Sequence, residues 1–256
     1  MEYIRRFGTT TSKTLFRVAI DGPAASGKSS TAKMVAQRLG FNYIDSGAMY
    51  RSVTLKALRE RLDPSLSEND SKIATLAQSI SLQLVTTPST TPNALPITRV
   101  FMDSEDVSEL IRTSDITRNI GGIAKNPEVR AALLTKQRAM GQGENHRDQN
   151  TKGIVMDGRD VTTVVFPDAE LKIYLQADAK VRAERRYQEM KAKNLEGSYD
   201  TILKELLERD HADMTRKISP LKKAKDAIVV DTSNMTFDEQ VERIVSLAQE
   251  KLKFDN

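Results

Sequence analysis

One eight-residue segment constrains this chain more than any other, and it reads Gly22-Pro23-Ala24-Ala25-Ser26-Gly27-Lys28-Ser29. It matches the pattern G-x-x-x-x-G-K-S/T, in which glycines allow a tight turn and main-chain N–H groups converge on phosphate oxygens. An apolar, β-branched run precedes it, and residues with helical spacing follow it: Ala32, Val35, Ala36 and Leu39. The segment, called the phosphate loop below, therefore predicts a strand, a phosphate-binding turn and a helix in succession.

Two side chains of the phosphate loop carry distinct expectations. Lys28 is placed to reach the β- and γ-phosphates of a bound nucleotide, and the Ser29 hydroxyl is placed to hold Mg²⁺. The spacing differs from the G-x-G-x-x-G pattern of dinucleotide-binding loops. A strand-to-helix turn that merely contains glycine is the alternative interpretation.

Five short apolar runs alternate with helical patterns along the chain. They span residues 16–20, 42–44, 153–156, 171–175 and 227–230. Strands that alternate with helices are typical of a parallel sheet covered on both faces. We therefore predict an α/β fold with a five-stranded parallel sheet. Between the second and third runs, residues 68–112 predict a small α+β insertion, and helices are expected from Asp115 to Met140.

Two polar clusters directly follow predicted strands. The first runs from Asp45 to Arg51, and the second is Asp157-Gly158-Arg159-Asp160. The carboxyl ends of parallel strands share one edge of a sheet, so both clusters should lie beside the phosphate loop. Asp157 is placed to help hold Mg²⁺ through water. A cap of a turn or helix is its alternative role.

The segment from Lys180 to Lys225 holds 13 basic and 8 acidic residues. Two sets of its residues share helix faces, namely Arg182, Arg185 and Arg186, and Arg209, Asp213 and Arg216. Clustered guanidinium groups suit phosphate recognition. A solvated face with salt bridges, such as Arg209 with Asp213, is the alternative.

Composition excludes several classes of site. The chain has no Cys and two His, which excludes disulfides, Fe–S clusters, thiol catalysis and zinc sites built on Cys. Its apolar runs fall far short of the ~20 residues that a membrane span requires. Aromatic residues make up 5% and Trp is absent, so platforms for stacking nucleic-acid bases are scarce. A nucleotide-gated binder of RNA or DNA that uses the basic segment nevertheless remains an alternative from another class.

Taken together, these motifs resemble cytidylate kinases of the bacterial type, from about Arg17 to Lys251. The resemblance rests on the phosphate loop and on further stretches in the same order: 19–23, 43–51, 156–160, 163–169, 184–186 and 219–221. It implies transfer of the γ-phosphoryl group of ATP to CMP or dCMP, with Mg²⁺, in pyrimidine nucleotide metabolism. It also implies a cytoplasmic monomer with small-molecule substrates, and no nucleic-acid or membrane partner.

The resemblance further implies three parts and a set of site residues. The parts are a P-loop core (15–67, 141–177 and 226–256), a monophosphate-binding insertion (68–140) and an Arg-rich helical lid (178–225), after a flexible tail (1–14) that could also be a targeting peptide. Expected catalytic residues are Lys28, Asp157, Arg159, Arg182 and Arg186. ATP is expected at residues 22–29 with Ser30 and Arg185, and Mg²⁺ at Ser29 and Asp157. The acceptor is expected at Ser46, Tyr50, Arg51, Arg130, Arg159, Asp160, Arg209, Asp213 and Arg216, with the base at Arg130 and Asp160 and the sugar at Asp213.

Two positions depart from the family's pattern. Ala25 stands where the loop usually has Gly or a similarly small residue, and we expect Ala to be tolerated there if its φ is negative. Gly121 stands where members often have a Ser that touches the base, so this chain lacks that hydroxyl for cytosine selection. The closest rival within enzymes is another acceptor, such as UMP, AMP or a sugar-like acid.

Overall fold

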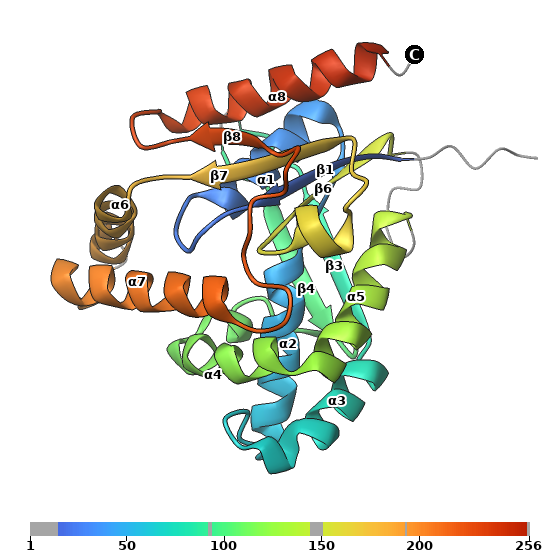
Figure 1. The fold of residues 1–256 in the computed structure, drawn as a ribbon, viewed down its shortest axis with the longest axis vertical. Helices are drawn as coiled ribbons and strands as arrows, with labels where there is room; N and C mark the ends of the chain where they lie inside the picture. The colour runs from blue at the N-terminus through green and yellow to red at the C-terminus, as the bar shows by residue number, and fades with distance from the viewer. Residues whose placement is uncertain (1–14, 92–93, 144–150, 193, 255–256) are drawn as a thin grey trace, which may run out of the picture.

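The computed structural model describes residues 15–91, 94–143, 151–192 and 194–254. The predicted tail, residues 1–14, lies outside them. A five-stranded parallel sheet forms the centre of the molecule (Figure 1), with strand order β2-β6-β1-β7-β8. The strands are β1 (Phe16–Asp21), β2 (Asn42–Asp45), β6 (Gly153–Gly158), β7 (Leu171–Gln176) and β8 (Ile228–Asp231). The predicted α/β fold with five parallel strands is thus confirmed.

Alternate residues along the strands of the sheet pack into two separate hydrophobic cores. In β1, Val18 and Ile20 pack with α1 (Lys28–Leu39) and α8 (Phe237–Phe254). Ala19 points to the opposite face, where it joins the core that includes α2 (Ser46–Arg59). This alternation is what the two-residue period of a strand requires when both faces are buried. Helices therefore cover both faces of the sheet, as predicted.

The predicted insertion shares its core with one face of the sheet. Its elements are a 3₁₀ turn (Ser67–Asn69), α3 (Asp70–Ser79), β3 (Leu82–Thr87), β4 (Ile97–Met102), β5 (Glu105–Asp106), a second 3₁₀ turn (Leu110–Arg112), α4 (Ser114–Lys125) and α5 (Pro127–Gly141). One apolar cluster runs from Met156 of the sheet through Val53 of α2 to Ile73 and Leu133 of the insertion. Packing against α2 therefore fixes the insertion to the sheet.

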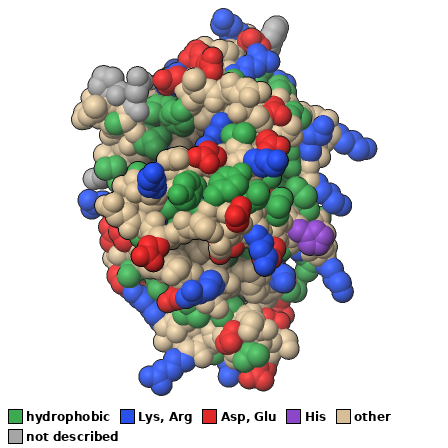
Figure 2. Space-filling view, turned by 90° about the vertical axis from the view of Figure 1, so that its left-hand side faces the viewer, with side chains coloured by type: hydrophobic (Ala, Val, Ile, Leu, Met, Phe, Trp, Pro, Cys, Tyr) green, Lys and Arg blue, Asp and Glu red, His purple; other side chains and the backbone are tan. Residues whose placement is uncertain are grey.

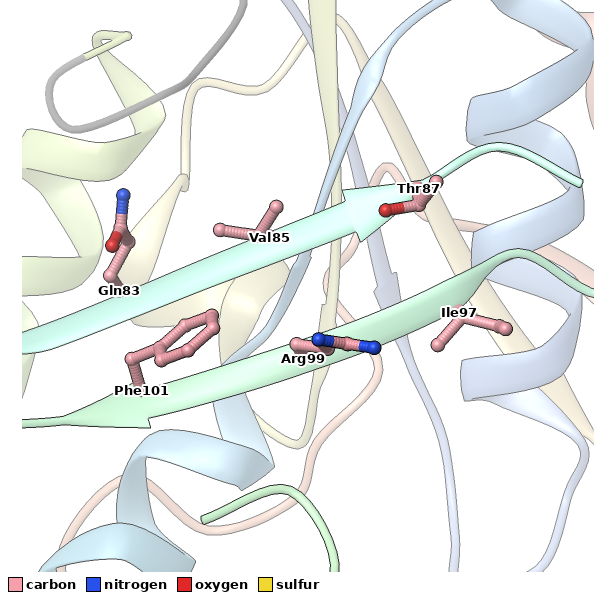
Figure 3. Close-up of a pocket in the computed structure, with 6 residues that line it drawn as sticks. All are labelled: Gln83, Val85, Thr87, Ile97, Arg99 and Phe101. Carbon is pink, nitrogen blue, oxygen red and sulfur yellow. The ribbon is translucent and has the colours of Figure 1, made fainter. Parts of the chain in front are cut away.

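The outer face of the β3–β4 ribbon is partly apolar (Figure 3). β3 and β4 pair in an antiparallel register, so alternate residues of each share this face. A hollow of about 420 Å³ is lined by Gln83, Val85, Thr87, Ile97, Arg99 and Phe101. None of these residues belongs to the predicted site or to the phosphate loop.

The remaining elements follow β6 and β7. A π-helical turn (Val161–Val165) comes after β6, where the apolar run gave no helical signal. Helices α6 (Ala179–Ala192) and α7 (Tyr199–Thr215) follow β7 and pack against each other beside the sheet (Figure 1). No helix in the described ranges is both long and apolar enough to cross a membrane.

The strand register brings three carboxylates to one edge of the sheet. Asp45 of β2 is paired with Asp157 of β6, and Asp21 of β1 is paired with Gly158. The phosphate loop leaves β1 at this edge. The predicted convergence of the two polar clusters on the loop therefore follows from the sheet itself.

Candidate functional site

The phosphate loop joins β1 to α1 with its main chain pressed against the sheet. A Cβ atom added to Gly22 would lie 2.0 Å from the carbonyl oxygen of Leu175, so only glycine fits there. Gly27 is the N-cap of α1 with φ 85°, and no side chain caps the helix. The first turn also has no acidic residue. The amide groups and the positive end of the helix dipole are thus left for an anion.

Lys28 is buried at this helix end with other cations near it. Its Nζ donates to the Pro23 carbonyl oxygen at 2.7 Å and lies 3.5 Å from the Ser26 Oγ. Burial, followed by the charges of Arg159 and Arg209, lowers its pKa well below the usual value, although Asp157 acts in the opposite direction. An ammonium in such surroundings is stabilised by an additional anion.

Ala25 differs from the sequence expectation. Its φ is 54°, in the left-handed region, so the condition of a negative φ is not met. The main chain has to reverse between Ala24 and Ser26 to form the turn, and an alanine at position 25 still adopts the left-handed conformation that this requires. A non-glycine residue there costs about 1 kcal/mol.

Asp157 is held by two hydroxyl groups. The Ser29 Oγ donates to its Oδ2 at 2.8 Å, and the Tyr43 Oη donates to its Oδ1 at 2.7 Å. Burial and then the charge of Asp45 raise the pKa of Asp157 to about 6. Sequence reasoning missed Tyr43, although its place two residues before the end of β2 puts it beside β6.

The residues expected at Mg²⁺ fit that ion chemically. Ser29 and Asp157 offer a hydroxyl and a carboxylate oxygen at one point, which are the hard donors that Mg²⁺ prefers. Across the described ranges, no group of three or more His, Cys, Asp or Glu residues is arranged to hold a metal. A site with few protein ligands suits Mg²⁺, which usually keeps several waters and phosphate oxygens.

Two of the α2 residues expected beside the acceptor, Ser46 and Arg51, lie at the same edge of the sheet. The Ser46 Oγ donates to the main-chain oxygen of Asp157 at 2.6 Å. The Arg51 guanidinium donates to the Thr117 Oγ1 of α4 at 3.2 Å. The sheet, α2 and the insertion thus meet at this point.

Five charged residues of alternating sign form a chain through the site. Arg130 donates to Asp160, and Arg216 lies 4.0 Å from the other oxygen of that carboxylate. Arg216 also lies 3.7 Å from Asp213, which accepts a 2.9 Å hydrogen bond from Arg159. Helix spacing related Asp213 to Arg216, and the second polar cluster related Arg159 to Asp160, but only the resemblance grouped all five residues. The fold brings all five together.

Two buried nitrogen atoms in this series of five charged side chains have no hydrogen-bond partner. They are the Nε of Arg130 and one terminal nitrogen of Arg216. The Arg130 guanidinium lies over the Tyr50 ring, 5.4 Å from its centroid. Buried donors are costly unless they find an acceptor, so both nitrogens indicate a binding position for an oxygen- or nitrogen-bearing ligand.

Arg51, Arg159 and Arg209 gather without enough acids to balance them. Burial, followed by the charges of Arg159 and Arg51, lowers the pKa of Arg209 to about 10, while the charge of Asp213 acts in the opposite direction. The pKa of Arg51 is also lowered, and burial is the largest cause. Within the described part of the chain, no side chain accepts a hydrogen bond from Arg209. We call Arg51, Arg159 and Arg209 the arginine cluster; its mutual repulsion favours an anion.

The three arginines of α6 share a face as predicted but contact different groups. Arg182 is buried and donates to the main-chain oxygens of Ala24 and Ala177. Arg185 donates to the Thr232 carbonyl oxygen at 2.6 Å, after β8. Arg186 is half-exposed and pairs with Glu189 of its own helix at 2.9 Å. Their expected closure over the donor nucleotide stays a prediction.

Two buried carboxylates that support the loop were missed by sequence reasoning. Asp21 accepts hydrogen bonds from Val161 N, Thr162 N and Thr162 Oγ1, and thereby ties the end of β1 to the π-helical turn. Asp210 accepts from Ala24 N at 2.9 Å. Their positions next to Gly22 and Arg209 were the available signal.

Comparison with known proteins agrees with this arrangement. A family model described as cytidylate kinase matches residues 18–250. A curated cytidylate kinase from Chloroherpeton thalassium is 45% identical over 235 residues, covering 90% of this chain and 92% of the relative. One from Chlorobaculum tepidum is 47% identical over 233 residues, covering 90% and 91%, respectively. One from Listeria monocytogenes is 46% identical over 235 residues, covering 92% and 96%. The phosphate loop, the polar clusters at the sheet edge and these matches over most of the chain place it in the cytidylate kinase family.

Proposed function

We propose that this protein transfers the γ-phosphoryl group of ATP to CMP or dCMP, forming CDP or dCDP and ADP. The observation that carries the proposal is a pair of adjoining anion sites: the phosphate loop with Lys28, and the arginine cluster. The charges of Arg159 and Arg209 act on Lys28 directly, so the two sites lie within one electrostatic field. Family membership supplies the nucleotide class.

The reaction requires little covalent chemistry from the protein's own groups. The acceptor's phosphate has its second pKa near 6, so its attacking oxygen is mostly ionised at neutral pH. That oxygen forms a bond to the γ-phosphorus while the bond to the β,γ-bridging oxygen breaks, and ADP leaves. Two polyanions must meet in line, so Lys28 and the arginine cluster would neutralise and orient them. Mg²⁺ held at Ser29 and Asp157 would supply further charge neutralisation on the donor phosphates.

The chain of alternating charges supports binding of the acceptor's base and sugar. Arg130 and Asp160 offer both a donor and an acceptor to a base edge, and Tyr50 supplies an apolar surface below Arg130. Asp213 lies close to the arginine cluster through Arg159, which suits a sugar between base and phosphate. Ser46 and Arg51 would hold the acceptor's phosphate end.

The division into core, insertion and lid belongs to the same proposal. The segments 68–140 and 178–225 each place arginines around the sheet edge, while the sheet carries the phosphate loop. We further propose that the protein acts as a monomer in the cytoplasm. The lack of a membrane-spanning helix among the described residues is in line with this.

Nucleic-acid binding is the weaker candidate. In Figure 2, which faces the side on which α6 and α7 lie in Figure 1, Lys and Arg side chains are interspersed with acidic and apolar ones. A continuous basic surface, the usual footprint for a phosphate backbone, is not seen on this face.

An acceptor panel tests the proposal. ADP release is measured with ATP and Mg²⁺ and either CMP, dCMP, UMP, AMP or no acceptor. We expect CMP and dCMP to exceed the others, and Lys28→Ala to lose at least about 100-fold in kcat. Lys191→Ala, an exposed lysine on α6, is the matched control and should keep full activity. Equal rates for all acceptors, or full activity of Lys28→Ala, would contradict the proposal.

A further inference from the structure

Both main-chain polar groups of Ala24 in the phosphate loop are held by one buried ion pair. Its N–H donates to the Asp210 Oδ1 at 2.9 Å, and its carbonyl oxygen accepts from the Arg182 guanidinium at 2.8 Å. The same guanidinium nitrogen lies 2.6 Å from the Asp210 Oδ2, and the Arg182 Nε donates to the Ala177 carbonyl oxygen at 3.0 Å. The pair spans α6 and α7, so two helices that are distant in sequence from the loop hold both peptide groups of Ala24.

The side chain of Ala24 is held by the same two helices. It belongs to a small apolar cluster with Ala183 of α6 and with Ile202 and Leu206 of α7. This cluster is separate from the two cores on the faces of the sheet. Both polar and apolar contacts therefore fix Ala24 to the α6–α7 pair. Ala25, the next residue, takes the left-handed conformation.

The hydrogen bonds that Asp210 and Arg182 make to Ala24 lie beside the arginine cluster. Arg209 precedes Asp210 on α7, and one helical turn beyond Asp210 lies Asp213, which holds Arg159 at 2.9 Å. A shift of α7 relative to the phosphate loop would move Arg209, and Arg159 with it. The position of the loop and the position of the cluster are thus set by the same helix.

We propose that Asp210 and Arg182 are positioning residues that couple the phosphate loop to the arginine cluster, so that binding of one nucleotide favours binding of the other. This inference rests on the proposed function. Arg182 acts on the loop's main chain through the Ala24 carbonyl oxygen. The coupling needs both carboxylate oxygens of Asp210, because one accepts from the loop and the other from Arg182. A buried pair of this kind adds little net stability but fixes one arrangement.

Asp210→Asn tests the proposal, since it keeps the shape and leaves only one acceptor oxygen. CMP affinity is measured by calorimetry with and without a non-hydrolysable ATP analogue, and kcat is measured in the ADP-release assay. We expect the wild type to bind CMP at least about 5-fold more tightly with the analogue, in the range of ordinary coupling between sites. The variant should lose this difference and at least about 10-fold in kcat.

Two further variants separate positioning from mere stability. Glu208→Gln removes an exposed carboxylate two residues away and should keep both kcat and the coupling. Arg182→Lys keeps the positive charge, but a lysine cannot make all three hydrogen bonds of Arg182, to Ala177, Ala24 and Asp210. It therefore tests the coupling if Asp210→Asn does not fold. A folded Asp210→Asn with wild-type kcat and coupling, or a wild type without coupling, would overturn the inference. Absence of CMP-dependent ADP release in the wild type would instead overturn the proposed function.

Discussion

Ala25 shows how one residue of the loop stores backbone strain. With φ at 54° it occupies a region that glycine reaches without a steric cost. We predict that Ala25→Gly raises the free energy of unfolding by about 0.5–1 kcal/mol in a urea titration. Ala131→Gly, at an exposed position inside α5, should lower it by about 1 kcal/mol. Destabilisation by both changes would show that the left-handed conformation carries no strain.

Asp21 gives the protein a pH-dependent stability. Burial raises its pKa to about 6 in the folded protein, although Thr162 and Val161 donate to it. The unfolded value is about 3.9. Its contribution to stability is therefore complete below about pH 3.9 and is lost as the pH rises through about 6.

The matched variant for this effect is Asp21→Asn, which cannot titrate. As the pH rises from 4 to 7.5, the free energy of unfolding of the wild type should fall relative to the variant by up to about 3 kcal/mol. The shift of Asp157 is common to both proteins and cancels in the difference. A difference that stays constant, or rises, would mean that the donated hydrogen bonds keep Asp21 ionised.

The residues that were predictable share one property, which is that their role follows from contiguous sequence. The phosphate loop carries its own geometry, so roles for Lys28 and Ser29 could be predicted directly. Tyr43 and Asp210 could not, because each acts on a residue more than 100 positions away and its partner depends on strand register or helix packing. The conformation of Ala25 was also hidden, since residue type alone did not give its φ.

At the scale of elements, two adjacent glycines of α4 have opposite surroundings. A Cβ on Gly121 would meet nothing within 4 Å, whereas one on Gly122 would lie 2.0 Å from the Pro64 carbonyl oxygen. We predict that Gly121→Ala raises the free energy of unfolding by up to about 1 kcal/mol through helix propensity. Gly122→Ala should lower it, because the Pro64 backbone must move. Thermal denaturation of both variants checks this pair, and equal shifts of Tm would contradict it.

Most elements were predictable and a few were not. The strands and the ribbon were visible because buried, β-branched runs and alternating patterns have clear periods. The π-helical turn was not, since Val161–Val165 is uniformly apolar or β-branched and its turn is fixed by the carboxylate of Asp21. Helix α2 also went unpredicted, because its first residues stood out as a polar cluster at a strand end.

At the scale of the whole molecule, the order of strands brings the functional segments together. β1 lies between β6 and β7, so the loop after β1 sits beside the ends of β2 and β6. The sequence could indicate a shared sheet edge, but it could not give the chain of alternating charges. That chain needs α5, the segment after β6, and α7 to meet, and such packing leaves no local pattern.

The central claim is that one site holds two nucleotides for direct transfer between them. The most direct measurement is the Kd of a compound that joins adenosine and cytidine through five phosphates, compared by calorimetry with the Kd of ADP. Both anion sites would be filled at once, so the compound should bind at least about 100-fold more tightly than ADP. A Kd no lower than that of ADP, with CMP still able to bind to the complex, would contradict the account.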